Sequence, residues 1–370
     1  MSIEIAMLNP EELSRYSRQY ILPEVGMDGQ QKLKKAKILV IGAGGLGCPI
    51  LQYLAAAGIG TLGIADFDVV DVSNLHRQIL YNITDLGKSK AIVASEKLGM
   101  LNPWVEFKVF TDKIDAYNAI SIVENFDIVV DGSDNFETRY IVNDACVLAN
   151  KPLVFGSIYK FEGQVSVFNY KGSGSYRCLF PETLGSDELP NCATIGVIGV
   201  LPGIIGTIQA NEVLKIVLEI GEVMHGKLLV IDALTLQFNA YQYNKDLKNF
   251  QIDAIAENKI SCAATALSPT SIAEISVQEL QLKIDSNEEL QLLDVRELNE
   301  YAAKNIGGIH IPLGSLRKQI TKLKLEVPTV VYCQSGIRSK QAFRIMKEEF
   351  GFTNILNLSG GLNAWYANYN

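Results

Sequence analysis

Apolar runs alternate with longer amphipathic stretches along the first half of the chain. The runs Ile38–Ile41 and Thr61–Ala65 contain β-branched residues at most positions that are not glycine or alanine, which predicts two buried parallel strands. Between them, the stretch from Leu46 to about Ala57 is predicted to be a helix. Further strands are predicted at 104–109, 126–130 and 152–157, and further helices at 87–101, 115–124 and 136–150. This alternation predicts an α/β fold with a mostly parallel sheet.

The hydrophobic pattern changes after residue 157. Apolar and polar residues alternate over Gly163–Phe168, which predicts antiparallel strands. A loop rich in Gly, Ser and Pro follows at 171–194, and the apolar stretch Ile195–Ile208 is predicted to be a buried helix because it is too short to span a bilayer. Strands at Lys227–Ile231 and Thr235–Tyr243 complete this part of the chain.

The chain of 370 residues is long enough for two domains. Periodicity is lost over residues 246–270, which we interpret as a linker between a first domain of residues 1–245 and a second of residues 271–370. The second domain is predicted to be a smaller α/β unit, with strands at Leu292–Arg296 and Thr329–Tyr332.

Composition narrows the class of protein. A net charge of −8 disfavours nucleic acid as the main partner, because phosphate binding needs a basic surface. The six cysteines form no C-x-x-C pair, which favours a reducing compartment over a disulfide framework. The N-terminus lacks the profile of a signal peptide. We therefore expect a cytoplasmic protein that does not bind a membrane.

A glycine motif follows the first predicted strand. Gly42, Gly44 and Gly47 have the G-x-G-x-x-G spacing, in which the first allows a tight turn, the second lets the backbone approach a phosphate, and the third permits close helix–strand packing. Asp66 ends the second predicted strand, where its carboxylate could hold a ribose. The motif alone indicates a dinucleotide site, as in an NAD-dependent oxidoreductase.

Charged residues further along the chain favour a triphosphate instead. Arg77 and Lys90 supply a guanidinium fork and a point cation, which the pyrophosphate of a nicotinamide cofactor does not need. Asp134 follows the predicted strand at 126–130 and is placed to bind magnesium; its alternative role is the N-cap of the helix at 136–150. Beside Arg77 and Lys90, the magnesium interpretation is preferred.

Two cysteines lie where a loop meets a helix. Cys192 ends the 171–194 loop and is either a thiol activated by the helix N-terminus or an inert small residue. Cys333 begins the loop Cys333–Arg338, which contains a glycine and opens a helix. Backbone N–H groups of such a loop, with Arg338 nearby, would stabilise a thiolate at Cys333.

These motifs resemble two families. Residues 1–245 resemble the MoeB/ThiF family, bacterial relatives of ubiquitin-activating enzymes, through Arg18, the Gly42–Gly47 loop, Asp66, Ser73–Gln78, Lys90, Asp134, Asn135 and Cys192. The last hundred or so residues resemble a rhodanese domain through Leu293–Arg296, Gly307–Pro312, Cys333–Arg338 and Ser359–Trp365. The resemblance implies a Rossmann-like adenylation domain followed by a smaller α/β rhodanese domain.

The resemblance also implies a reaction. The C-terminal glycine carboxylate of a small ubiquitin-like sulfur carrier ending in Gly-Gly would be adenylated with ATP and Mg²⁺, and a persulfide on Cys333 would convert it into a thiocarboxylate. The sulfur donor would be a cysteine desulfurase or thiosulfate, and the pathway molybdopterin synthesis, thiamine synthesis or tRNA thiolation. Cys192 would either release the product through a disulfide or form a thioester with the carrier.

By the same resemblance, each site residue has an expected role. Asp66 would hold the ribose, Arg77 and Lys90 the triphosphate, and Asp134 the magnesium ion, while Arg18 would come from the neighbouring subunit of a homodimer. The remaining expected nucleotide-binding residues are Gly42, Gly44, Gly45, Gly47, Ser73, Asn74 and Asn135.

The chain departs from the family at one place. Many members carry two C-x-x-C pairs that bind a structural zinc, but here the first pair reads Ser175-Tyr176-Arg177-Cys178, and no Cys occurs between 192 and 262. Tetrahedral zinc needs four ligands, so we expect no structural zinc.

Two other functions compete with adenylation. An NAD-dependent oxidoreductase would leave Arg77, Lys90 and Asp134 unexplained. A non-catalytic scaffold that binds the carrier is disfavoured, because no residue expected for adenylation is missing.

Overall fold

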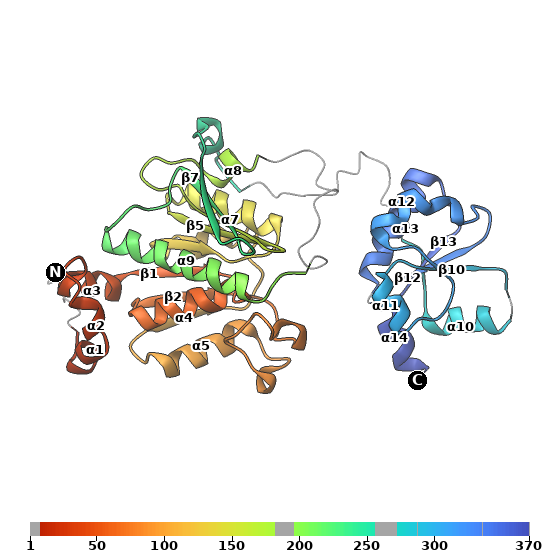
Figure 1. The fold of residues 1–370 in the computed structure, drawn as a ribbon, viewed down its shortest axis with the longest axis horizontal. Coiled ribbons are helices and arrows are strands. Elements are labelled where there is room, and N and C mark those ends of the chain that lie inside the picture. Colours follow the sequence, from red (N-terminus) through yellow and green to blue (C-terminus); the bar gives the residue numbers. More distant parts are fainter. Residues whose placement is uncertain (1–7, 182–195, 256–271, 287, 335, 370) are drawn as a thin grey trace. The chain divides into compact units, whose positions relative to one another are not determined.

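The computed structural model describes residues 8–181, 196–255, 272–286, 288–334 and 336–369. The chain divides into two compact units, residues 1–263 and 264–370. Each unit has its own sheet (Figure 1). Each also has its own hydrophobic core. The predicted linker contains one short 3₁₀ turn, Leu247–Phe250, and otherwise falls largely outside the described residues.

The first unit is built on an eight-stranded sheet of order β3-β2-β1-β4-β5-β6-β7-β8. The parallel strands are β1 (Lys37–Ile41), β2 (Thr61–Ala65), β3 (Glu106–Phe110), β4 (Ile128–Asp131) and β5 (Leu153–Tyr159). The antiparallel strands are β6 (Glu162–Phe168), β7 (Lys227–Asp232) and β8 (Gln237–Gln242). The predicted mostly parallel α/β sheet is confirmed, including the change of direction after β5.

Helices cover both faces of this sheet. They are α1 (Pro10–Arg15), α2 (Ser17–Tyr20), α3 (Gly26–Lys35), α4 (Gly47–Ala57), α5 (Lys90–Leu101), α6 (Ala119–Val123), α7 (Phe136–Leu148), α8 (Tyr176–Leu179) and α9 (Val200–Leu218). In β1, Ile38 and Val40 join the core under α4, α5 and α9, whereas Leu39 and Ile41 join the core under α6 and α7. Because both faces are covered, the strand is apolar at every inner position.

Helix α9 passes the length and composition test for a membrane span. Its side chains Leu201, Ile205 and Val213 are nevertheless fully buried in the core that also contains α4 residues. It is therefore a core helix, as the apolar stretch predicted, although it extends ten residues beyond the expected end at Ile208.

The second unit contains a parallel sheet of order β11-β10-β12-β13-β9. Its strands are β9 (Glu274–Ile275), β10 (Gln291–Asp294), β11 (Ile309–His310), β12 (Thr329–Tyr332) and β13 (Ile355–Leu358). Its helices are α10 (Val277–Asp285), α11 (Leu298–Ala303), α12 (Leu316–Gln319), α13 (Ile337–Phe350) and α14 (Gly361–Asn368). This is the smaller α/β domain expected from the sequence.

The strand order of the first unit predicts where a ligand binds. From β1 the chain passes to β2 and β3 on one side and to β4 and β5 on the other. Connections that leave in opposite directions open a crevice at the carboxyl ends of the strands, and ligands of open α/β sheets bind there.

Candidate functional site

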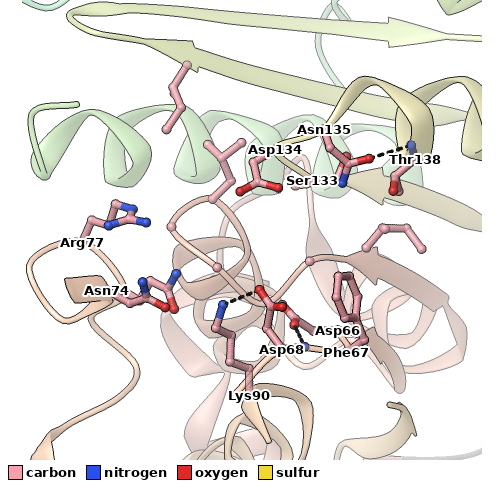
Figure 2. Close-up of a pocket in the computed structure, with 18 of the residues that line it drawn as sticks. Asp66, Phe67, Asp68, Asn74, Arg77, Lys90, Ser133, Asp134, Asn135 and Thr138 are labelled. Carbon is pink, nitrogen blue, oxygen red and sulfur yellow. Dashed lines mark hydrogen bonds and ion pairs between the residues drawn. The ribbon is translucent and has the colours of Figure 1, made fainter. Parts of the chain in front are cut away.

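A cavity of about 580 Å³ lies at this crevice, a volume suited to a nucleotide (Figure 2). It brings together most of the residues selected from the sequence: Gly42, Gly44, Gly45, Asp66, Ser73, Asn74, Arg77, Lys90, Asp134 and Asn135 all line it. Figure 2 shows the labelled side chains converging from separate elements, with Arg77, Asn74 and Lys90 on one side and Asp134 and Ser133 on another. The carboxyl ends of β1, β2 and β4 hold these elements together.

The glycine loop joins β1 to α4. Gly42 has φ +87°, and a Cβ there would lie 2.8 Å from the carbonyl oxygen of Gly132. Gly47 does not line the cavity; a Cβ at Gly47 would lie 1.9 Å from the carbonyl oxygen of Gly42. The loop therefore needs glycine first for its turn and last for helix–strand packing. The loop residues Gly44, Gly45 and Leu46, which directly precede α4, line the cavity, so the N-terminal end of this helix faces it.

Asp66 follows β2 and is held in one orientation. One carboxylate oxygen accepts the N–H of Ala43 at 2.7 Å, and the other accepts the N–H of Asp68 at 2.8 Å. Burial raises the pKa of Asp66, and Lys90 and the two N–H groups oppose this rise. Each oxygen keeps a second lone pair, so the carboxylate can still accept a hydroxyl of a ribose.

Arg77 and Lys90, the two cations selected from the sequence, differ in their partners. Lys90, the first residue of α5, is almost fully buried and lies 3.0 Å from the carboxylate of Asp68. Arg77 donates to the backbone oxygen of Ser73 at 3.1 Å and contacts His76. No carboxylate of the described residues forms an ion pair with Arg77, so its charge is available to an anion.

Asp134 lies just beyond β4 and is exposed. The N-cap of α7 is Asn135, whose side chain accepts the N–H of Thr138 at 2.8 Å (Figure 2). The alternative role of Asp134 as the cap is therefore wrong, and within the described chain its carboxylate has no hydrogen bond or ion pair. Asn135 both caps the helix and lines the cavity.

The carboxylate of Asp134 fits a magnesium ion that arrives with a nucleotide. Mg²⁺ is usually held by one or two carboxylates together with phosphate oxygens and water. Among the described residues, no group of three or more His, Cys, Asp or Glu side chains is arranged to hold a metal by itself. The described residues therefore form no all-protein metal site, and one carboxylate is what a magnesium ion bound mainly through phosphates would need from the protein.

Sequence reasoning missed Arg139, which forms part of the cavity wall. It is buried, and donates to the backbone oxygen of Ser133 at 3.0 Å and to the hydroxyl of Ser157 at 3.2 Å. It lies 3.9 Å from Asp131, the last residue of β4, whose pKa burial raises. The sequence feature that could have identified it is an arginine one helical turn after Asn135, on a helix face whose other residues pack against the sheet. Asp68, Phe67, Lys113, Ile114 and Lys160 also line the cavity and were not selected.

Arg18 is not brought to this cavity within the chain. It is exposed on α2, and its neighbour Gln19 donates to the backbone oxygen of Ala57 at 3.1 Å. Ala57 ends α4, whereas the glycine loop precedes Gly47 at its other end; 11 residues of helix span roughly 16 Å. Cys192 lies outside the described residues.

Cys333 lies between β12 and α13 and is buried. Its sulfur accepts the N–H of Gly336 at 3.2 Å and lies 3.5 Å from the hydroxyl of Ser339. Arg338, expected beside the sulfur, instead donates both of its terminal nitrogens to Glu300, at 2.7 Å each. The groups that contact the sulfur are therefore the backbone N–H of Gly336 and the hydroxyl of Ser339, and Arg338 is held by Glu300 instead.

Comparison with known proteins identifies the family of each part of the chain. The ThiF family matches residues 16–252, and the rhodanese-like domain matches residues 276–368. The chain belongs to the ThiF family. Its C-terminal part is a rhodanese-like domain.

Two relatives of this ThiF-family chain match almost its whole length, and a third matches about three fifths of it. The chain is 41% identical over 368 residues to the probable adenylyltransferase/sulfurtransferase MoeZ of Mycobacterium tuberculosis, covering 97% of this chain and 94% of that protein. It is 39% identical over 400 residues to adenylyltransferase and sulfurtransferase MOCS3 of Xenopus laevis, covering 98% and 88%. The sulfur carrier protein adenylyltransferase of Thermus thermophilus is 52% identical over 233 residues, covering 62% of this chain and 86% of that protein.

A solved structure shows the same fold. Escherichia coli MccB, crystallised with ATP, superimposes with a TM-score of 0.56 and 24% identity, covering 63% of this chain and 71% of that one. From its family and relatives, this chain is an enzyme, an ATP-using adenylyltransferase joined to a sulfurtransferase.

The position where family members bind zinc is occupied differently in this chain. The Cys178 sulfur accepts the backbone N–H of Asp246 at 3.3 Å, the backbone N–H of Ser175 at 3.4 Å and the side-chain amide of Asn249 at 3.5 Å. Burial raises the pKa of the Cys178 thiol, but these hydrogen bonds outweigh it and the pKa is lowered overall. Donors aimed at one sulfur do not fit a tetrahedral zinc, which needs four lone-pair ligands. The metal content itself stays a prediction.

Proposed function

We propose that this enzyme adenylates the C-terminal glycine carboxylate of a small ubiquitin-like sulfur carrier ending in Gly-Gly, and then converts it into a thiocarboxylate. The observation that carries the proposal is the cavity in which Arg77, Lys90 and Asp134 surround one glycine loop. The printed names of the relatives, which include a sulfur carrier protein adenylyltransferase, agree with it. The carrier's pathway is molybdopterin synthesis, thiamine synthesis or tRNA thiolation.

The adenylation step needs little from a base. The nucleophile is already a carboxylate, so the protein has to position it against the α-phosphate and stabilise the charge that builds up there. Asp66 would hold the ribose, and Arg77 and Lys90 would neutralise the triphosphate as pyrophosphate leaves. Asp134 would hold Mg²⁺, which supplies further neutralisation of the phosphates when bound.

The sulfur step starts at Cys333. Its thiolate attacks the sulfane sulfur of a donor, a cysteine desulfurase persulfide or thiosulfate, and the donor's remaining part leaves. The terminal sulfur of the Cys333 persulfide then attacks the acyl-adenylate, AMP leaves, and an acyl disulfide forms. A second thiol attacks Cys333 in that disulfide and releases the thiocarboxylate, leaving a disulfide between the two cysteines. Cys192 is the candidate; the alternative is that Cys192 first forms a thioester with the carrier.

The position of Arg18 supports a homodimer. Within one chain it lies at the end of α4 remote from the cavity, and it can act on a bound nucleotide only from a neighbouring subunit. We therefore propose that two copies form the active enzyme in the cytoplasm, each supplying Arg18 to the other's cavity.

Exchange of labelled pyrophosphate into ATP tests the adenylation proposal. We expect exchange that requires both Mg²⁺ and a carrier with a free Gly-Gly terminus, and none with a carrier that lacks its last glycine. Exchange without any carrier, or ATP hydrolysis without exchange, would contradict a reversible acyl-adenylate.

A further inference from the structure

The charges around Cys333 are paired. Arg338, five residues after the sulfur, forms a two-pronged ion pair with Glu300 of α11, with both N–O distances 2.7 Å. Both side chains are less than one-third exposed, so solvent screens the pair only partly. In agreement, the hydrogen bond to Arg338 lowers the pKa of Glu300, and the same hydrogen bond raises the pKa of Arg338.

Two further cations near the loop are also paired. Arg296 contacts the loop through Gln334 at 3.3 Å, but it is buried against Asp294 at 2.6 Å. Lys340, in the first turn of α13, lies 2.8 Å from Glu274. The described residues thus offer the sulfur the backbone N–H of Gly336 and the hydroxyl of Ser339, while these three cations are each paired with a carboxylate.

The charge of Glu300 is not needed for the fold of α11. Glu300 is the third residue of that helix, and its carboxylate accepts the backbone N–H of Glu297 at 3.0 Å in a capping box. Glutamine serves equally at this position of a capping box. What a glutamine would lose is the charged two-pronged pair with Arg338.

We propose that Glu300 masks Arg338 and thereby sets the donor specificity of Cys333 toward sulfane donors of low charge, such as a persulfide on a thiol, and against the thiosulfate dianion. This inference rests on the proposed role of Cys333 as sulfur acceptor. With thiosulfate, the thiolate takes the sulfane sulfur and sulfite leaves with two negative charges. With a thiol persulfide, the thiolate takes the outer sulfur and a thiolate leaves with one. Only the reaction with thiosulfate places enough negative charge beside the sulfur to need a cation that is not already paired with a carboxylate.

Two donors that differ mainly in charge test the proposal. Thiosulfate carries two negative charges and methanethiosulfonate carries one, and both transfer a sulfane sulfur that cyanide then removes as thiocyanate. In the full-length protein, Glu300→Gln should raise kcat/KM for thiosulfate about tenfold and for methanethiosulfonate about threefold, because the attraction of one unmasked cation scales with the charge of the donor. Both gains should shrink at high salt.

Matched variants distinguish the masking of Arg338 by Glu300 from other effects of removing a carboxylate. Glu349→Gln removes the same charge from a two-pronged Glu–Arg pair at the other end of α13, with Arg317, and should change neither donor. The double variant E300Q/R338Q should return thiosulfate turnover to about the wild-type level, because the unmasked cation is gone. A gain that persists in E300Q/R338Q, or one equal for both donors, would overturn the masking role. Thiocyanate formation by Cys333→Ala would instead overturn the role of Cys333.

Discussion

Ser339 is the residue whose role the sequence motifs gave no reason to examine. Its hydroxyl is fully buried and lies 3.1 Å from the backbone oxygen of Gly336 and 3.5 Å from the Cys333 sulfur. A hydroxyl has one proton to donate, so it can serve the carbonyl when the sulfur is a thiol and the sulfur when it is charged. It therefore adds a side-chain donor to the backbone N–H of Gly336.

Ser339→Ala should slow alkylation of Cys333 by iodoacetamide about fivefold at pH 7, the scale expected for losing one hydrogen bond of about 1 kcal/mol. Mass spectrometry of the tryptic peptide that contains Cys333 follows the reaction. Slowing that is accompanied by a lower thermal unfolding temperature would point to a packing defect instead of a lost donor.

Asp134 provides the second prediction at the scale of a residue. Because its carboxylate has no partner in the described chain, its removal should disturb the nucleotide site and little else. Asp134→Ala should lower ATP–pyrophosphate exchange by roughly two to three decades, the scale for losing one preorganised charged group.

The matched control is Asp127→Asn, at the opposite end of β4. Its carboxylate accepts the N–H of Lys37 at 2.8 Å, a contact that the amide oxygen of asparagine can keep. This variant should exchange normally. Full activity of Asp134→Ala would remove the proposed metal ligand.

At the scale of elements, α8 is attached to its surroundings on two sides. Arg177 donates twice to Asp144 of α7, at 2.7 and 2.8 Å, on one side. On the other side, Cys178 accepts from Asp246 and Asn249, in the segment that follows β8. These contacts link the start of the 171–194 loop to α7 and to the chain after β8.

Elemental analysis of the purified protein should therefore find no stoichiometric zinc, and a chelator should leave its thermal unfolding temperature unchanged. The triple variant S175C/D246C/N249C should gain about one zinc per chain, because its three new thiolates would join Cys178 as the four ligands that zinc needs. The single variant Ser175→Cys is the control and should bind no zinc tightly. About one zinc per wild-type chain would show that ligands exist that we have not identified.

At the scale of the whole molecule, each partial reaction belongs to a unit with its own core. Cys333→Ala should therefore leave ATP–pyrophosphate exchange intact while abolishing sulfur transfer from thiosulfate to cyanide. Cys192→Ala should spare both partial reactions and slow only the full conversion of carrier to thiocarboxylate. Normal thiocarboxylate formation by Cys333→Ala with a sulfane donor, measured by mass spectrometry of the carrier, would exclude the rhodanese-like domain as the sulfur source.

The proposed homodimer makes a further prediction at this scale. Arg18→Ala and Asp134→Ala should each be inactive in exchange, but mixing the two after dissociation should restore part of the activity. A mixed dimer has one cavity with both defects and one with neither, if Arg18 acts across the interface. Mass spectrometry shows whether mixed dimers have formed. If such dimers recover no activity, Arg18 does not act on the cavity of the neighbouring subunit.

Much of this enzyme could be predicted from contiguous stretches of sequence. Residues adjacent in the chain determine the order and type of the strands, the turn at Gly42, the close packing at Gly47 and the loop that holds Cys333. Local sterics and side-chain periodicity act over a few residues, so they are visible without the fold.

Only the tertiary structure determined which charges meet. Three features join residues from different elements. Lys90 pairs with Asp68, Arg139 is buried in the cavity wall, and Arg338 forms an ion pair with Glu300. The helix α7 begins one residue later than a cap at Asp134 would require. Asn135 is therefore its N-cap, and the Asp134 side chain is not used as the cap. An ion pair depends on distances of a few ångströms between side chains, and such distances between remote residues exist only once the chain has folded.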